Sequence, residues 1–240
     1  MTGVRVAAVG DVHLDADVLG RYRPALEHLP DKADVLLLAG DLTRHGTPEE
    51  AQCVAQEFGG LGVPVIAVLG NHDYHCDQPE KVTAILQEAG ITVLEGDGVV
   101  LSCGDQRVGI AGAKGFGGGF AGRCGSEFGE PEMKAFTRHT RDVSERLGEA
   151  LRSLDCDMRI ALTHYAPVPE TLVGEPLEIY PFLGSYLLAQ AIDSAPGTVL
   201  AVHGHAHAGS ERGTTPGGVK VRNVAHPVIK QAYSVYELTG

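Results

Sequence analysis

The sequence is poor in positive charge. Its 240 residues include 19 lysines and arginines against 31 aspartates and glutamates, which gives a formal net charge of −12 at pH 7. A general positive field holds proteins to nucleic acids and to anionic membranes, so we expect neither as a partner. An anionic substrate would need a local positive centre. Bound divalent cations would supply one, and the formal count omits them.

Cysteine pairs and long apolar runs are also missing. Five cysteines, an odd number, occur without a C-x-x-C pair, so the sequence signals neither a disulfide framework nor a structural zinc site. No apolar run approaches the ~20 residues of a membrane span. The first strand begins at Val4 without the basic and apolar segments of a secretory signal. We therefore expect a cytoplasmic protein. The sequence does not indicate its oligomeric state.

Regularly spaced apolar segments are abundant instead. Three apolar strands are followed by polar residues at 11, 41 and 71, a spacing of 30 residues, which is about one βα step. Thr47-Pro48-Glu49-Glu50 predicts the start of one connecting helix through a capping box. Crossovers of this kind are right-handed almost without exception, so the carboxyl ends of the three strands should point the same way.

The second half changes rhythm. Short strands are predicted at 91–94, 98–102 and 107–112 as part of a second, antiparallel or mixed sheet, followed by a glycine-rich loop at 113–130 and a long helix at 131–154. Further strands (158–163, 198–202, 218–224, 232–238) and helices (15–30, 183–193) complete the chain. We predict an α/β fold with two packed mixed β-sheets flanked by helices, in a single domain over residues 1–240.

Polar clusters follow five of the apolar strands. The strand at 198–202 runs directly into His203-Gly204-His205-Ala206-His207, and four other strands end in Asp11 and His13, in Asp41, in Asn71-His72-Asp73 and in His164. Open α/β sheets place ligand sites at the carboxyl ends of their strands, so these side chains should converge. Mixed oxygen and imidazole ligands suit Mn, Fe or Zn better than Ca or Mg.

Each motif has an ordinary structural interpretation when taken singly, as a helix cap, a turn residue or a core histidine. Together they would bury many polar groups at great cost unless a metal bound them. Strand alternation favours His203 as a core residue, and Arg44 is either a phosphate contact or a surface arginine. Gly117-x-Gly119-x-x-Gly122 matches a dinucleotide fingerprint formally, but no helix is predicted at Gly122, so we reject it. The loop instead suits an adaptable rim.

The five motifs, in this order and spacing, resemble the calcineurin-like metallophosphoesterase superfamily over residues 5–225. Residues 113–119 also resemble the Icc-related bacterial phosphoesterases within it. The resemblance implies a four-layer αββα sandwich and two divalent or trivalent metal ions. The first ion would be held by Asp11, His13 and His207, the second by Asn71, His164 and His205, with Asp41 bridging the two.

The expected chemistry accounts for the residue types. A bridging carboxylate holds two cations about 3.5–4 Å apart, and these ions activate water as the nucleophile. His72 is placed to contact a phosphoryl oxygen or to protonate the leaving group, and Asp73 to fix the tautomer of His72. We expect a metallophosphoesterase that acts on a small phosphomonoester or phosphodiester without a covalent intermediate. The alternative is a non-catalytic protein-binding scaffold of the same fold, against which the intact ligand positions weigh.

Overall fold

The protein is described by a computed structural model, which covers residues 3–239. Its first sheet has five strands in the order β13-β1-β2-β3-β4. Four of them run parallel, and β13 pairs with β1 in the antiparallel sense. The strands are β1 (Val4–Val9), β2 (Val35–Ala39), β3 (Val65–Val68), β4 (Ile91–Val93) and β13 (Ser234–Leu238). The regular βα rhythm thus gives the parallel sheet predicted from it, although β4 joins this sheet and not the second one.

The second sheet is mixed and has six strands in the order β11-β12-β10-β9-β6-β5. Its centre is parallel, and the two outer pairs, β5 with β6 and β11 with β12, are antiparallel. The strands are β5 (Asp97–Cys103), β6 (Gln106–Ala113), β9 (Met158–Thr163), β10 (Thr198–His203), β11 (Arg212–Thr214) and β12 (Lys220–Asn223). A small hairpin of β7 (Gly119–Phe120) and β8 (Arg123–Cys124) lies inside the glycine-rich loop.

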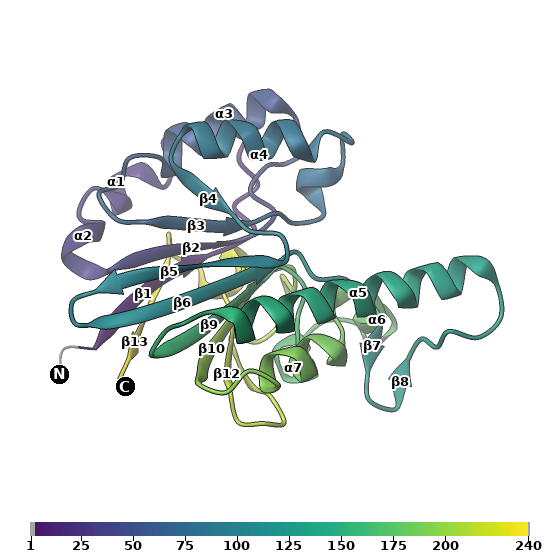
Figure 1. Ribbon diagram of the computed structural model, residues 1–240. Helices are drawn as coiled ribbons and strands as arrows, with labels where there is room; N and C mark the ends of the chain where they lie inside the picture. Colours follow the sequence, from purple (N-terminus) through teal and green to yellow (C-terminus); the bar gives the residue numbers. More distant parts are fainter. Residues whose placement is uncertain (1–2, 240) are drawn as a thin grey trace.

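Helices cover the outer face of each sheet (Figure 1). On the first sheet, α3 (Pro48–Phe58) and α4 (Pro79–Glu88) contribute Val54, Phe58 and Leu86 to a buried cluster that includes Leu36 and Leu38 of β2. On the second, α5 (Pro131–Ser153) and α7 (Tyr186–Asp193) bury a similar cluster. A third apolar cluster fills the space between the sheets. This confirms the predicted four-layer sandwich.

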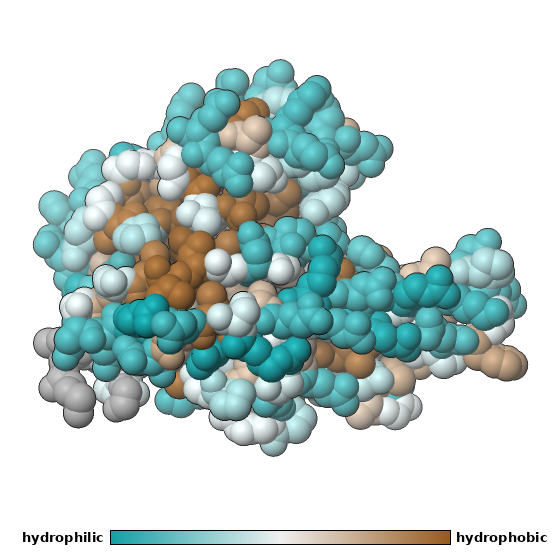
Figure 2. Space-filling view, in the orientation of Figure 1, coloured by the Kyte–Doolittle hydropathy of each residue, from teal (hydrophilic) through white to brown (hydrophobic). Residues whose placement is uncertain are grey.

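Strand alternation explains how two cores share one strand. Along β1, Ala7 and Val9 belong to the cluster beneath the helices, whereas Val6 and Ala8 belong to the cluster between the sheets. Because both faces are covered, the strand reads as a continuous apolar run. Figure 2 shows hydrophobic residues at one edge of the sandwich, over the region of β3–β6 in Figure 1, where side chains of β5 pack only partly against the core.

The helix start at Thr47 is confirmed. Its side chain accepts from the backbone of Glu50, and the Glu50 carboxylate accepts from the backbone of Thr47. The single helix predicted at 15–30 is wrong: the structure has α1 (Arg23–Leu26) and α2 (Leu29–Lys32). A proline near the start of each, Pro24 and Pro30, has no N–H to continue a preceding helix.

The remaining helical segments are short. They are the 3-10 helices η1 (His72–Tyr74), η2 (Pro169–Leu172) and η3 (Leu177–Ile179), and the α-helices α6 (Tyr180–Leu183) and α8 (His226–Ile229). Over residues 3–239, none of the helices combines the length and the apolar composition that crossing a membrane requires.

Candidate metal centre

The carboxyl ends of β1, β2, β3, β9 and β10 meet where the two sheets face each other. Within the first sheet, the Asp11 amide donates to the Gly40 carbonyl at 2.9 Å, and the His13 amide to the Asp41 carbonyl at 3.1 Å. Between the sheets, the His205 amide donates to the Asp11 carboxylate at 2.9 Å. The loops after these strands are therefore held against each other by hydrogen bonds within the protein itself.

Several residues at this place have left-handed backbone conformations. Six residues other than glycine in the described chain have positive φ, and four of them are predicted ligands: Asp11 (55°), His13 (44°), Asp41 (50°) and His205 (71°). Such conformations are uncommon for residues with a side chain, and they concentrate at functional sites. The fold thus holds the backbone of these residues in an unfavourable conformation, which sets the direction of their side chains.

Two glycines allow the loops to approach closely. A Cβ on Gly70 would lie 2.1 Å from the Asp41 carboxylate, and a Cβ on Gly204 would lie 2.3 Å from that of Asp11. Neither position could hold a larger residue without displacing a predicted ligand. This is the physical reason for glycine directly before Asn71 and His205.

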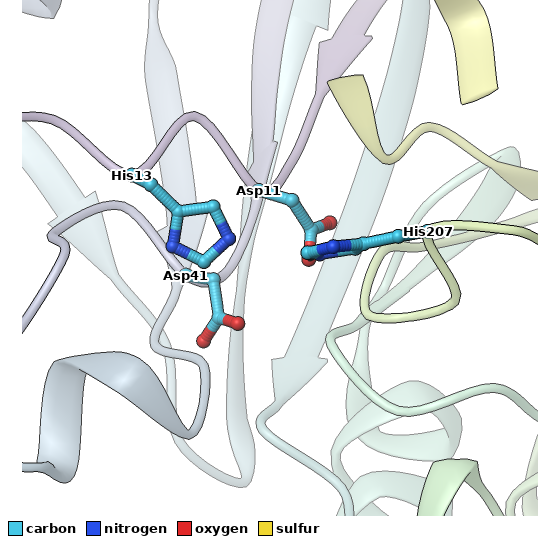
Figure 3. A group of neighbouring side chains, drawn as sticks. All are labelled: Asp11, His13, Asp41 and His207. Carbon is cyan, nitrogen blue, oxygen red and sulfur yellow. The ribbon is translucent and has the colours of Figure 1, made fainter. Parts of the chain in front are cut away.

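One group of side chains consists of Asp11, His13, Asp41 and His207 (Figure 3). Each offers a ligand atom, and these atoms all lie within 4.8 Å of one another. His207 reaches Asp11 with 2.8 Å between Nε2 and Oδ1. The His13 ring stands edge-on to that of His207, with 5.4 Å between their centroids. Two carboxylates and two imidazoles therefore converge from β1, β2 and β10.

A second group shares Asp41 with the first. It contains His164 and His205, whose ligand atoms lie within 4.8 Å of each other and of Asp41. Asn71 joins them through its side-chain oxygen, 3.0 Å from His164 Nε2. The Nδ1 atom of His164 is 2.8 Å from the Ala39 carbonyl. Because that carbonyl can only accept, Nδ1 carries the hydrogen and Nε2 faces the group.

Burial and charge act against each other at Asp41 and His164. Burial alone would raise the pKa of Asp41, but the neighbouring His164 and His72 outweigh it and hold that pKa well below its usual value. Burial alone would lower the pKa of His164, but the charge of Asp41, 3.3 Å away, raises it to about 9. A proton on His164 thus plays the electrostatic part that a cation would play there.

The other imidazoles divide by environment. Burial lowers the pKa of His205 to about 3, and burial also lowers the pKa of His13. The hydrogen bond to Asp11 raises the pKa of His207. Metal binding requires neutral imidazole. Two of these rings are therefore neutral near pH 7, whereas His164 would have to lose its proton first.

His72 lies beside both groups without joining either. Its amide donates to the Asp41 carboxylate at 2.8 Å, and its ring lies 4.5 Å from that of His13, centroid to centroid. Its Nδ1 atom is 2.8 Å from the Arg44 carbonyl, so Nδ1 carries the hydrogen. The Nε2 atom is directed to the shared carboxylate, 4.0 Å from Asp41 Oδ2. The ring remains 42% exposed.

Asp73 was expected to fix the tautomer of His72, and this prediction is wrong: the His72 Nδ1 atom pairs with the Arg44 carbonyl, and the Asp73 carboxylate has other partners. Its carboxylate is fully buried and accepts from the backbone of Leu42, Thr43 and Gly70 and from the Thr43 hydroxyl. Burial, with the Asp41 charge, raises its pKa to about 6. Asp73 thus joins the loops after β2 and β3, and the backbone carbonyl of Arg44 sets the tautomer of His72.

The sequence model of the calcineurin-like phosphoesterase family matches residues 4–209. The chain belongs to this family. A probable cyclic nucleotide phosphodiesterase from Synechococcus sp. is 44% identical over 90 residues, which span 33% of this chain and only 34% of that relative. The finer resemblance to the Icc-related group stays a prediction.

Two solved structures show the same fold. Phosphopantetheinyl hydrolase from Mycobacterium tuberculosis has a TM-score of 0.66 at 16% identity, over 95% of this chain and 91% of that one. A dimetal phosphatase from Danio rerio has a TM-score of 0.61 at 13% identity, over 99% and 93%. At such identities the likeness concerns architecture alone.

Two other polar residues have structural roles in this phosphoesterase-family chain. His203 is fully buried, with Nε2 2.8 Å from the Thr171 hydroxyl, and burial lowers its pKa to about 4. Arg44 forms ion pairs with Asp15 and Asp17. The core interpretation of His203 and the surface interpretation of Arg44 therefore describe their contacts.

Another cluster of potential ligands lies at the surface. Asp15, His45 and Glu50 offer ligand atoms within 4.8 Å of one another. The Glu50 carboxylate already accepts from the amides of His45 and Thr47, and Asp15 pairs with Arg44. These contacts account for the cluster as a helix cap and a surface ion pair.

Proposed function

We propose that this protein is a metal-dependent phosphoester hydrolase with a dinuclear centre. The observation that carries the proposal is the pair of ligand groups that share the buried carboxylate of Asp41. A shared carboxylate between two nitrogen- and oxygen-rich groups is the arrangement that a two-metal site requires. Four of the proposed ligand residues have a left-handed backbone conformation, which supports the same interpretation.

The donor atoms fit the ions. Asp11, His13 and His207 would hold one metal, and Asn71, His164 and His205 the other, with Asp41 binding both. Carboxylate, amide and imidazole donors in this mixture suit Mn, Fe or Zn. When bound, the cations would lower the pKa of water towards neutrality and offset the charge of a phosphoryl group.

His72 is the proposed proton donor to the leaving oxygen. Its Nδ1 is committed to the Arg44 carbonyl, so Nε2, on the side of Asp41, is the nitrogen that exchanges a proton with substrate. Asp73 is proposed as a positioning residue: it fixes the loops that carry Asp41 and His72 through four donors. A ring held this way loses little freedom in reaching the substrate.

The substrate in this proposal is a small phosphomonoester or phosphodiester. The formal charge of −12 supports the absence of a nucleic-acid or anionic-membrane partner, because a general field of that sign repels both. The proposal also treats residues 1–240 as one catalytic domain that works in the cytoplasm.

Metal analysis combined with turnover tests the proposal. Protein saturated with Mn and freed of excess ion should contain about two ions per chain. It should hydrolyse p-nitrophenyl phosphate or bis(p-nitrophenyl) phosphate, and the ratio of the two rates decides between monoester and diester preference. Metal-loaded protein that turns over neither ester, nor any of a panel of phosphorylated metabolites, would favour the scaffold alternative.

The pH dependence of activity follows from His164. Its pKa of about 9 in the metal-free protein means that a proton occupies the ligand nitrogen below that pH and competes with metal increasingly as pH falls. Activity should therefore fall below neutrality, and the acid-side midpoint should move to lower pH when Mn is raised. We would record kcat/KM from about pH 5.5 to 8 at two Mn concentrations. A midpoint unmoved by Mn would point to a catalytic group instead.

A further inference from the structure

Lys114 follows β6 at the same sheet edge as the candidate ligands. In the register of the second sheet, Ala113 of β6 lies opposite Thr163 of β9, so Lys114 is the lateral neighbour of His164. Its carbonyl accepts from the amides of His164 and Tyr165 at 3.0 and 3.1 Å. Its amide donates to the Glu95 carboxylate at 3.0 Å. The backbone is fixed on both sides, and the side chain leaves it at a defined point.

Three aromatic rings surround the ammonium group. Its Nζ lies 5.1 Å from the ring centroid of Tyr74, 5.0 Å from that of Phe116 and 5.2 Å from that of Tyr165. The negative faces of aromatic rings attract a cation at such distances and hold it without neutralising it. The rings come from η1, the glycine-rich loop and the segment after β9, so the position depends on the assembled fold.

In the described part of the chain, no carboxylate forms an ion pair with the ammonium group. Among residues 3–239 it forms no ion pair, and its one polar contact is the Gly115 carbonyl at 3.4 Å. Glu95, the nearby acid, also contacts Arg146. Burial lowers the pKa of Lys114, and the charges of Glu95 and Asp41 offset this lowering only in part. A cation with a single weak polar contact is unexpected in a chain of net charge −12 that offers many carboxylates. Its position has a functional reason if it binds an anionic ligand.

The aromatic ring of Tyr165 connects Lys114 to the second ligand group. Its centroid lies 4.4 Å from that of His205, and the His164 ring is 5.6 Å away in an edge-on arrangement. Lys114 is therefore one ring removed from two candidate metal ligands. The charge of Asp41 also acts on the ammonium group, so Lys114 lies close enough to the ligand groups to interact with them electrostatically.

We propose that Lys114 is a substrate-binding residue whose ammonium group contacts an anionic oxygen of the phosphorylated substrate on the side of His164 and His205. This inference rests on the proposed function and adds to it. The oxygen belongs either to the scissile phosphoryl group or to a second anionic group of the same substrate. Tyr74, Phe116 and Tyr165 hold the cation in place and leave its outer side for the anion.

Binding of inorganic phosphate to the Mn-loaded protein, measured by calorimetry, tests the proposal together with two non-hydrolysable ligands. Ethylphosphonate and phosphonoacetate have the same phosphonyl group, but the second replaces a methyl group with a carboxylate. Lys114→Met keeps the apolar stem against the rings and removes the charge. Lys114→Arg keeps the charge, and Lys134→Met, at an exposed site on α5, controls for the loss of one lysine.

Lys114→Met should weaken at least one ligand about tenfold, the range of a hydrogen bond to a charged group. Weakening of phosphate and of both phosphonates assigns the contact to the phosphoryl group. Weakening of phosphonoacetate alone assigns it to a second anionic group. Lys114→Arg should retain most of the affinity, Lys134→Met all of it, and the Mn content should stay at the wild-type value in each.

Affinities of folded Lys114→Met within about twofold of wild type for all three ligands would overturn the proposal. If that variant does not fold, Lys114→Gln takes its place in the same binding measurements. The salt dependence of ligand binding by Lys114→Arg then tests the proposal as well. Failure of the proposed function has a different signature, because Mn-loaded wild type would then hydrolyse no phosphoester even though its phosphate binding depended on Lys114.

Discussion

Asp41→Ala should lower the Mn content from about two ions per chain to one or fewer and reduce kcat by about 10³-fold or more. The carboxylate is buried and is the only side chain common to both ligand groups among the described residues. Its loss would remove a ligand from each of the two proposed ions. A metal contributes several kcal/mol of transition-state stabilisation, and each 1.36 kcal/mol is tenfold in rate. Metal analysis and steady-state kinetics on both p-nitrophenyl esters would measure the two effects.

Asp77→Ala is a matched control for that change. Asp77 also has a left-handed backbone, with φ of 54° against 50° for Asp41, but it is exposed and belongs to neither ligand group. It should retain full metal content and activity. Asp41→Asn, which keeps an acceptor for the His72 amide, should still lose metal. Two bound ions in Asp41→Ala would exclude the bridging role.

His72→Ala should reduce kcat by about 10²- to 10⁴-fold, the usual effect of removing a positioned acid. Metal content should be unchanged, because the ring lies outside both ligand groups. The penalty should be largest for alkyl phosphates, whose leaving oxygen needs a proton, and smaller for p-nitrophenyl phosphate. Comparison of kcat for the two kinds of ester in wild type and variant measures the difference.

His28→Ala serves as the control for removing an imidazole, since the His28 side chain is highly exposed and, within residues 3–239, forms an ion pair with Asp31 alone. It should leave every parameter at the wild-type value. Loss of a metal ion in His72→Ala would make His72 a ligand or a structural residue. Equal penalties on both esters would leave it a phosphate-binding group and remove the general-acid assignment.

The fold could be predicted to the extent that local sequence determines it. The 30-residue steps and the capping box at Thr47 lie within short windows, so the parallel order of β1, β2 and β3 followed from them. The prediction that the strand at 91–94 belongs to the second sheet is wrong, because its pairing with β3 depends on contacts between segments far apart in the sequence. The helix at 15–30 failed because Pro24 and Pro30 divide the segment.

The candidate site was predictable in composition and less so in its connections. Polar residues at strand ends are visible in the sequence, and the convergence of parallel strand ends brings them together. The partners of Asp73 and of the His72 ring were not visible, because they are backbone amides and a backbone carbonyl. Lys114 lies within the glycine-rich loop at 113–130, but only the packed fold brings three separate rings around it.

The two ligand groups draw on both ends of the chain. The contact between Asp11 and His207 joins residues 196 positions apart, and that between the Ala39 carbonyl and His164 spans 125. Closing loops of this length is entropically unfavourable until most other contacts exist. During synthesis, the first three strands emerge with carboxylates but without the imidazoles of β9 and β10. A partly made chain therefore has no complete site, and capture of metal there would report that both sheets have assembled.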